Sequence, residues 1–144
     1  MQIRKINEVT IGAMALGKAV ELGRQLVLAT DKDFANKLAQ KSDGKVKPET
    51  LQEWANGYIA FDAIISITGV LAMLQGMRKN RKGAGQAALV QGGTIIGYSV
   101  YYLLYSLIGL SEAKTSVKFT NVVLSLAHAA GGIVIFRFAQ RAVK

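Results

Sequence analysis

Long apolar stretches with almost no charged residues dominate the second half of the chain. Residues 83–111 form 29 consecutive positions without a charge, and residues 119–136 form 18 more. Residues 58–77 make a third stretch, interrupted only by Asp62. About 20 apolar residues in a helix cross the hydrocarbon core of a bilayer. The pattern therefore predicts an all-α integral membrane protein with three transmembrane helices over 58–77, 84–110 and 118–137.

The first 57 residues are predicted to form an amphipathic helical region that precedes the transmembrane part, residues 58–144. Within 9–29, Val9, Leu16 and Val20 share one face at helical spacing, and Lys18 and Glu21 mark a narrow opposite stripe. Two interpretations remain open. The segment lies on the membrane or against the other helices, which we favour, or it is a fourth span in which Lys18 and Glu21 pair one turn apart, away from lipid.

Two shorter helices are expected between this segment and the first clear span. Residues 30–45 suit a short helix with Thr30 or Asp31 as its N-cap and Gly44 at its end. Pro48 suits the first position of another helix over 48–58.

The distribution of charged residues indicates how the spans are oriented in the membrane. The net charge is +9, yet seven of the 9 acidic residues lie in the first 53 positions. The connection between the first two spans and the C-terminal tail are basic and carry no acid: Arg78, Lys79, Arg81, Lys82, Arg137, Arg141 and Lys144. Because Lys and Arg collect on the cytoplasmic side, we expect this loop and the C-terminus to lie there. A fourth span would bring Arg4 and Lys5 to the same side.

Small residues in the spans predict close contacts between helices. They form a GxxxG step on the second span and a small-xxx-small step on the third: Gly93, Gly97, Ala127, Gly131 and Gly132. Small side chains let helix backbones approach, which matters because lipid provides no hydrophobic drive for helix association.

Several polar and aromatic residues in the spans are candidates for packing or for chemistry. Tyr98, Tyr101, Tyr102 and Tyr105 share one helix face. Their hydroxyls are expected to bond to neighbouring helices, and a surface for a lipid, quinone or pigment is the alternative. His128 is the single histidine; we expect an interhelical hydrogen bond, with axial ligation of a haem or chlorophyll as the less favoured interpretation.

The polar residues near the ends of the spans suggest further contacts between helices. Asp62 is expected to reach the interface or to pair with a lysine of the Lys114–Lys118 loop. Gln75, Gln86 and Gln91 lie towards the basic side and are expected to bond between helices.

The residue set favours a non-enzymatic membrane protein. The chain has no cysteine, which excludes disulfides, thiolate metal sites and cysteine nucleophiles, and no Ser/His/Asp set or phosphate-binding glycine loop is present. We expect no cofactor other than bound lipid.

The favoured function is a structural or scaffold subunit of a larger membrane assembly, either an energy-transducing complex or the membrane of a lipid-containing virion. Its partners would be membrane lipids and other membrane subunits or further copies of itself. Nucleic acid is expected at most in electrostatic contact with the basic side. The alternatives are a small pore-forming or holin-like protein, and a subunit that binds a pigment, haem or quinone.

Overall fold

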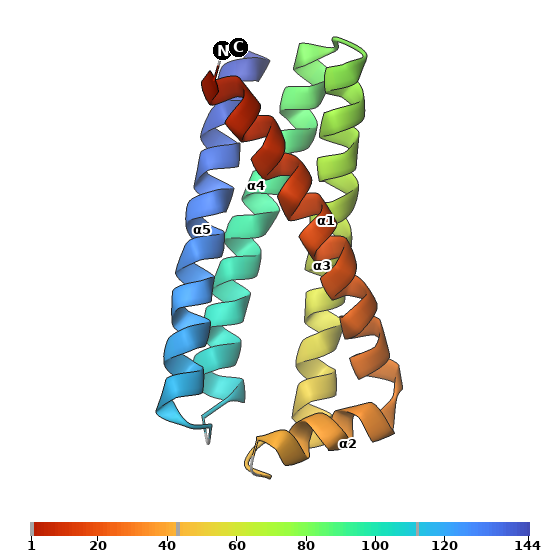
Figure 1. Cartoon of the computed structure of the whole chain (residues 1–144), viewed down its shortest axis with the longest axis vertical. Coiled ribbons are helices and arrows are strands. Elements are labelled where there is room, and N and C mark those ends of the chain that lie inside the picture. Colours follow the sequence, from red (N-terminus) through yellow and green to blue (C-terminus); the bar gives the residue numbers. More distant parts are fainter. Residues whose placement is uncertain (1, 43, 112) are drawn as a thin grey trace.

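Four long helices run side by side along the whole molecule in the computed structural model, which describes residues 2–42, 44–111 and 113–144 (Figure 1). They are α1 (Gln2–Thr30), α3 (Pro48–Met77), α4 (Arg81–Leu104) and α5 (Thr115–Val143). A short helix, α2 (Lys32–Lys41), lies across one end, and a π-helical turn, η1 (Tyr105–Gly109), extends α4. The described residues contain no strand, so the predicted all-α fold is confirmed.

Three helices are long and apolar enough to cross a membrane: Pro48–Met77, Arg81–Gly109 and Thr115–Val143. They contain the predicted first and third spans and overlap the predicted second span, 84–110, which ends one residue beyond Gly109. The residues that they add to the predicted spans are mostly polar, as expected of helix ends that lie outside the hydrocarbon core. A helix can continue beyond the core as long as its backbone hydrogen bonds are made.

α3 begins at Pro48 and continues without a break into the first span. Pro48 occupies the first helical turn, where its missing N–H would have no partner. The separate helix expected over 48–58 is therefore the first part of α3, and the expected boundary between residues 57 and 58 lies inside one continuous helix.

α2 caps the end of the bundle at which α1 finishes. Asp31 ends the connection from α1, and its carboxylate accepts a hydrogen bond from the Phe34 N–H at 3.0 Å, as expected of an N-cap. The helix finishes at Lys41 with Ser42 as its C-cap, before Gly44. Its apolar side packs into a cluster at this end, made of Leu28, Ala35, Ala39, Val46, Leu51, Ala55 and Leu110.

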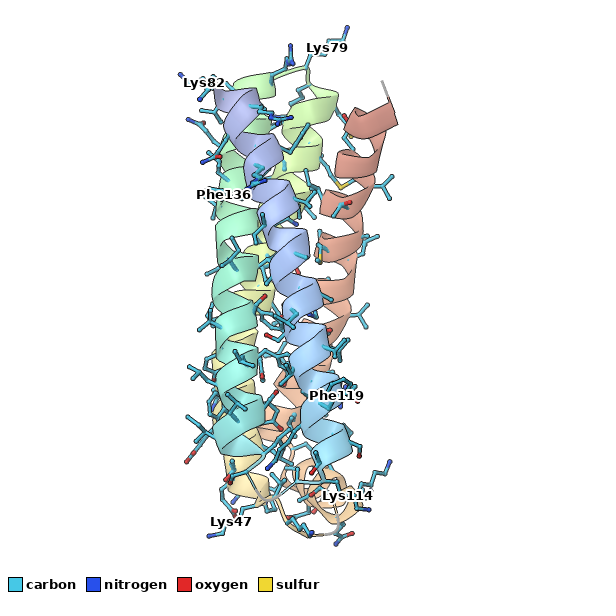
Figure 2. The ribbon with its side chains drawn as sticks, turned by 90° about the vertical axis from the view of Figure 1, so that its left-hand side faces the viewer. Lys47, Lys79, Lys82, Lys114, Phe119 and Phe136 are labelled. Atoms are coloured by element: carbon cyan, nitrogen blue, oxygen red, sulfur yellow. The ribbon has the colours of Figure 1, made fainter. Side chains whose placement is uncertain are left out.

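The helices alternate in direction, so both termini and the α3–α4 connection meet at the other end (Figure 1). We call this the basic end, because the α3–α4 connection and the C-terminal tail that meet there are basic and carry no acid. Lys79 and Lys82 lie at this end, and Lys47 and Lys114 lie at the α2 end (Figure 2). α1 packs mainly on α3, and α5 packs mainly on α4. α1 and α5 have much less contact with each other.

α1 packs with the polar stripe of its sequence turned inward. Lys18 is 2% exposed, whereas Leu16 and Val20 on the expected apolar face are 72% and 77% exposed. The helix packs against α3, and the face that we expected to pack faces outward. Lys18 and Glu21 pair one turn apart, as the fourth-span interpretation expected. Sequence periodicity identifies two faces of a helix and does not say which of them meets the protein when the surroundings are apolar.

Candidate functional site

A buried ion pair joins α1 to α3. Lys18 is 2% exposed and Asp62 is 0% exposed, and the Lys18 Nζ lies 3.4 Å from the Asp62 Oδ1. Lys18 also pairs with Glu21, one turn further along α1. Within the described part of the chain, the carboxylate oxygens of Asp62 accept no hydrogen bond. The Lys18 ammonium is therefore the group that compensates for burial of this carboxylate.

Tyr98 of α4 adds a third helix to this site. Its hydroxyl donates to the Glu21 Oε2 at 3.3 Å, and the Lys18 Nζ lies 3.4 Å from the centre of its ring. A cation placed over an aromatic face at that distance is attracted by the ring quadrupole. We call Lys18, Glu21, Asp62 and Tyr98 the ionic cluster. It connects α1, α3 and α4 through polar contacts in which Lys18, Asp62 and Tyr98 are buried and Glu21 is partly exposed.

The expected partner of Asp62 was wrong. Asp62 was expected to reach the interface or to pair with a lysine of the Lys114–Lys118 loop. It is instead fully buried, and α1 places Lys18 beside it. The sequence held one indication of this pairing. Lys18 and Asp62 each interrupt an apolar helix, and an unpaired charge within such a helix is costly.

An aromatic layer lies next to the ionic cluster, with Tyr58 of α3 at its centre. The Tyr58 ring centre is 5.0–5.8 Å from the ring centres of all four tyrosines on the predicted face of α4 and η1: Tyr98, Tyr101, Tyr102 and Tyr105. Trp54 stacks at 4.8 Å from Tyr101 and 5.3 Å from Tyr105. Such tilted and edge-on arrangements are the favoured geometries of aromatic pairs.

The tyrosine hydroxyls mostly bond to other helices, which is the packing role expected for them. Tyr101 donates to the Trp54 carbonyl at 3.2 Å, and Tyr102 donates to the Asn121 Oδ1 at 2.8 Å. The buried Tyr58 hydroxyl has no partner among the described residues. Sequence reasoning missed Tyr58 as the centre of the layer, because its position relative to α4 depends on tertiary packing.

His128 of α5 stands beside the aromatic layer. Its ring centre is 5.2 Å from that of Tyr98 and 6.3 Å from that of Tyr102. The Nδ1 donates to the Leu124 carbonyl at 2.7 Å. This bond lies within α5, whereas an interhelical bond was expected. It leaves Nε2 as the nitrogen with which His128 would bind a ligand. The described residues contain no group of three or more metal-binding side chains.

Gln91 of α4 joins three helices at one point. It is fully buried, and its Nε2 donates to the Ile11 carbonyl of α1 at 3.1 Å and to the Ile65 carbonyl of α3 at 3.3 Å. This placement agrees with the expected role of Gln91 between helices. Gln75 instead accepts from Asn80 at 2.9 Å in the α3–α4 connection, and Gln86 is exposed.

The close contact between α4 and α5 depends on glycine at positions 92 and 132. A Cβ added at Gly92 would lie 2.8 Å from the Phe136 nitrogen and 2.9 Å from the Gly132 oxygen. The predicted step is displaced by one residue, because Gly93 is exposed and Gly97 faces Phe61 of α3.

On α5, the other predicted small residues lie away from this contact. Ala127 is exposed, and Gly131 faces Met14 of α1. Gly132 is thus the member of the predicted set that makes the α4–α5 contact. Nearby, the Ser125 hydroxyl adds a bond of 2.6 Å to the Ser99 carbonyl between the same two helices.

The basic residues predicted to define topology gather at the basic end. Arg78, Lys79, Arg81 and Lys82 lie at the α3–α4 connection, and Arg137, Arg141 and Lys144 lie along the last turns of α5. All seven are exposed.

Comparison of this chain with protein-family models, with curated proteins and with solved structures gives no match. The geometry described above is therefore the basis of the functional argument.

Proposed function

We propose that this protein is a non-enzymatic structural subunit of a larger membrane assembly, built as a single bundle of four membrane-embedded helices. One observation carries the proposal: polar groups from all four long helices contact other helices of the same bundle. Lys18 pairs with Asp62, Gln91 bonds to two backbones, and Tyr102 bonds to Asn121. In the membrane, such contacts fix the arrangement of helices that hydrophobicity alone cannot order.

α1 belongs in the membrane as a fourth span on this proposal. Its charged residues Lys18 and Glu21 contact Asp62 and Tyr98 inside the bundle, and its outward face is apolar. An apolar exterior around a paired polar interior is the arrangement expected of a helix surrounded by lipid. The basic end would then lie on the cytoplasmic side, in agreement with the positive-inside rule.

The α2 end offers a surface for a protein partner outside the bilayer. Ala35 and Ala39 anchor α2 in the apolar cluster at this end, while the opposite face of the helix is exposed and polar, with Asn36, Lys37, Gln40 and Lys41. A short helix fixed in this way presents its side chains on a rigid support, which lowers the entropic cost of binding.

The rival functions predict different geometry. A pore lines one helix face with polar groups along its length. Here Gln91 and the ionic cluster contact neighbouring helices, and rings occupy the adjacent layer. A pigment or haem carrier would use the Nε2 of His128, next to Tyr98 and Tyr102. The larger assembly would be an energy-transducing complex or the membrane of a lipid-containing virion.

The test is extraction from the native membrane in mild detergent, followed by native mass measurement. The proposal expects a discrete hetero-complex of fixed stoichiometry. A homo-oligomer that makes liposomes leak ions would overturn it in favour of a pore. A Soret or chlorophyll absorption band in the purified protein would overturn it in favour of a cofactor carrier.

A pair of variants locates the contact with the partner. Reversing two charges on the exposed face of α2, in K37E/K41E, is expected to release the partner while leaving the helical circular dichroism unchanged. The matched control K45E reverses an exposed charge at the same end but outside α2. Retention of the partner by the double variant would contradict docking through α2.

A further inference from the structure

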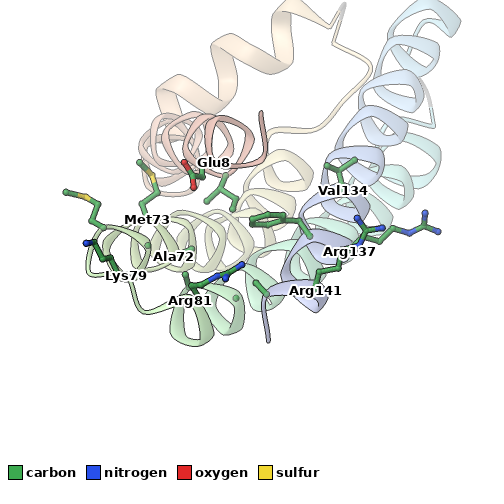
Figure 3. Close-up of a pocket in the computed structure, with 15 residues that line it drawn as sticks. Glu8, Ala72, Met73, Lys79, Arg81, Val134, Arg137 and Arg141 are labelled. Carbon is green, nitrogen blue, oxygen red and sulfur yellow. The ribbon is translucent and has the colours of Figure 1, made fainter. Parts of the chain in front are cut away.

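A large cavity opens at the basic end of the bundle. Its volume is about 1100 Å³, and its walls come from α1, α3, α4 and α5 (Figure 3). Arg81 comes from α4, Arg137 and Arg141 come from α5, and Glu8 and Met73 come from α1 and α3 (Figure 3). Sites for small molecules commonly have volumes of ~300–1,000 Å³, so this cavity has room for a sizeable ligand.

Polarity changes in the same direction along each wall. On α5, Arg141 and Arg137 lie nearer the end of the bundle than Val134, and on α4 Arg81 lies nearer the end than Gly85. The same order holds for the remaining two walls. Lys79 lies beyond Met73 and Ala72 of α3, and Glu8 lies beyond Ile11 of α1. The charged lining residues therefore lie at the mouth, together with the apolar Met77, Phe138 and Ala142, and the lining towards the middle of the bundle is apolar.

The charged mouth is strongly biased towards cations. Four cationic residues line it: Lys79, Arg81, Arg137 and Arg141. Among the described lining residues, the acidic one is Glu8. Within the described part of the chain, none of the three guanidinium groups forms an ion pair. Guanidinium groups bind phosphate through paired N–H donors, so Arg81 on the α4 side and Arg137 and Arg141 on the α5 side provide suitable ligands for a phosphate group (Figure 3).

The apolar part of the cavity is open at its side. Met73 of α3 and Val134 of α5 line it and are 46% and 47% exposed. In a membrane these two residues face the hydrocarbon core on either side of α1, so the acyl chains of a bound lipid can lie along them. A soluble phosphate would leave this apolar surface unused.

We propose that this cavity binds one anionic phospholipid, with its headgroup phosphate among Arg81, Arg137 and Arg141 and its acyl chains along Met73 and Val134. Charge complementarity and the polarity gradient identify the ligand class. Basic pockets between transmembrane helices on the cytoplasmic side are suited to anionic headgroups. The proposal requires the bundle to be embedded in a membrane, and it does not require a protein partner.

The test measures lipid binding to the purified full chain in a non-ionic detergent by native mass spectrometry. Dioleoyl phosphatidylglycerol, dioleoyl phosphatidylcholine and inorganic phosphate are titrated separately. The wild type is expected to retain one phosphatidylglycerol about tenfold more tightly than phosphatidylcholine. Inorganic phosphate at millimolar concentration is expected not to displace it, because it lacks acyl chains.

Two triple variants separate the cavity from the general charge of this end. R81Q/R137Q/R141Q removes the guanidinium groups at the mouth and is expected to weaken phosphatidylglycerol binding by at least about tenfold. R78Q/K82Q/K144Q removes three cations of the same end that do not line the cavity, and binding is expected to stay within about twofold. Circular dichroism melting of each variant checks that the bundle remains folded.

A third variant keeps the charge and changes only its geometry. R81K/R137K/R141K is expected to bind phosphatidylglycerol with intermediate affinity, because lysine provides a point charge without the planar donor pair. Equal losses in the two glutamine variants would overturn the proposal, as would equal affinity for the two lipids. Displacement of the lipid by millimolar inorganic phosphate would show a phosphate site and would overturn the lipid assignment.

Discussion

α1 and α4 are both packed inside the same bundle, but they are held there in opposite ways. α4 meets α5 through small residues, with Gly92 and Gly132 in backbone contact. α1 meets α3 and α4 through charged and polar groups, with Lys18 beside Asp62 and Tyr98. The comparison shows that a charged side chain in the middle of a helix can be buried, provided that a neighbouring helix provides the opposite charge.

The difference also explains why α1 is absent from the helices that hydropathy identifies as spans. Hydropathy averages every residue of a helix, so paired charges count as if each were exposed to lipid. A polar contact shared between two helices removes much of that cost without changing the average.

Breaking the ion pair between α1 and α3 should have the largest effect. Lys18→Met leaves the Asp62 carboxylate buried without its cation, which typically costs about 3–5 kcal/mol. The free energy of unfolding in detergent, measured by thermal or denaturant unfolding, should fall by that amount. The double variant K18M/D62L removes both charges and should recover most of the loss. A double variant as unstable as the single one would contradict the assigned pair.

Filling the contact between α4 and α5 should have the next largest effect. Gly92→Ala places a methyl group 2.8–2.9 Å from backbone atoms of Phe136 and Gly132, and such overpacking costs about 1–3 kcal/mol. Gly93→Ala is the matched control, because its nearest atom outside its own helix is the Phe136 Cε2 at 3.9 Å. It should leave the midpoint of thermal unfolding unchanged or raise it slightly. Equal destabilisation by the two variants would contradict the assignment of the α4–α5 contact to the Gly92 face of α4.

Removing the amide that links three helices should have a smaller effect. Gln91→Leu loses the bonds to the Ile11 and Ile65 carbonyls, which in a membrane protein are worth about 1 kcal/mol together. Both carbonyl oxygens belong to helices, so neither loses its only hydrogen bond. The exposed Gln86→Leu provides the comparison and should not change the unfolding midpoint. A stabilised Gln91→Leu variant would show that the amide does not hold α1 against α3 and α4.

The smallest predicted effects separate two tyrosines of the aromatic layer. Tyr102→Phe loses the bond to Asn121 and should cost about 0.6 kcal/mol. Tyr58→Phe removes a buried hydroxyl that has no partner among the described residues, so stability should stay equal or rise. A loss on Tyr58→Phe larger than that on Tyr102→Phe would reverse the assignment.

The sequence predicts the spans well and the contacts between them less well, for a physical reason. Charge-free stretches of sufficient length identify α3, α4 and α5, because the cost of placing charge in lipid is local to each helix. Which face of a helix meets which neighbour depends on its rotation, and one residue along a helix turns the face by about 100°. The predicted step at Gly93 therefore missed the contact at Gly92 by one residue.

The partners of single polar residues show the same limit. Asp62 needs a cation nearby, but the sequence offers several, and the bundle selects Lys18 from the helix that was expected to present its apolar face. The sequence could predict that the tyrosine face points inward, because four phenols at helical spacing favour bonds to neighbouring helices. Their convergence on Tyr58 depends on how α3 and α4 pack.

The most direct test of the account is the side of the membrane on which each end of α1 lies. The absence of cysteine allows single cysteines at Glu8, Asn36 and Lys82 to be labelled with a membrane-impermeant maleimide in sealed vesicles. If α1 crosses the membrane, Glu8→Cys and Lys82→Cys react from the same side, and Asn36→Cys reacts from the opposite side. If Glu8→Cys reacts from the same side as Asn36→Cys, α1 does not span, and the four-helix membrane bundle is wrong.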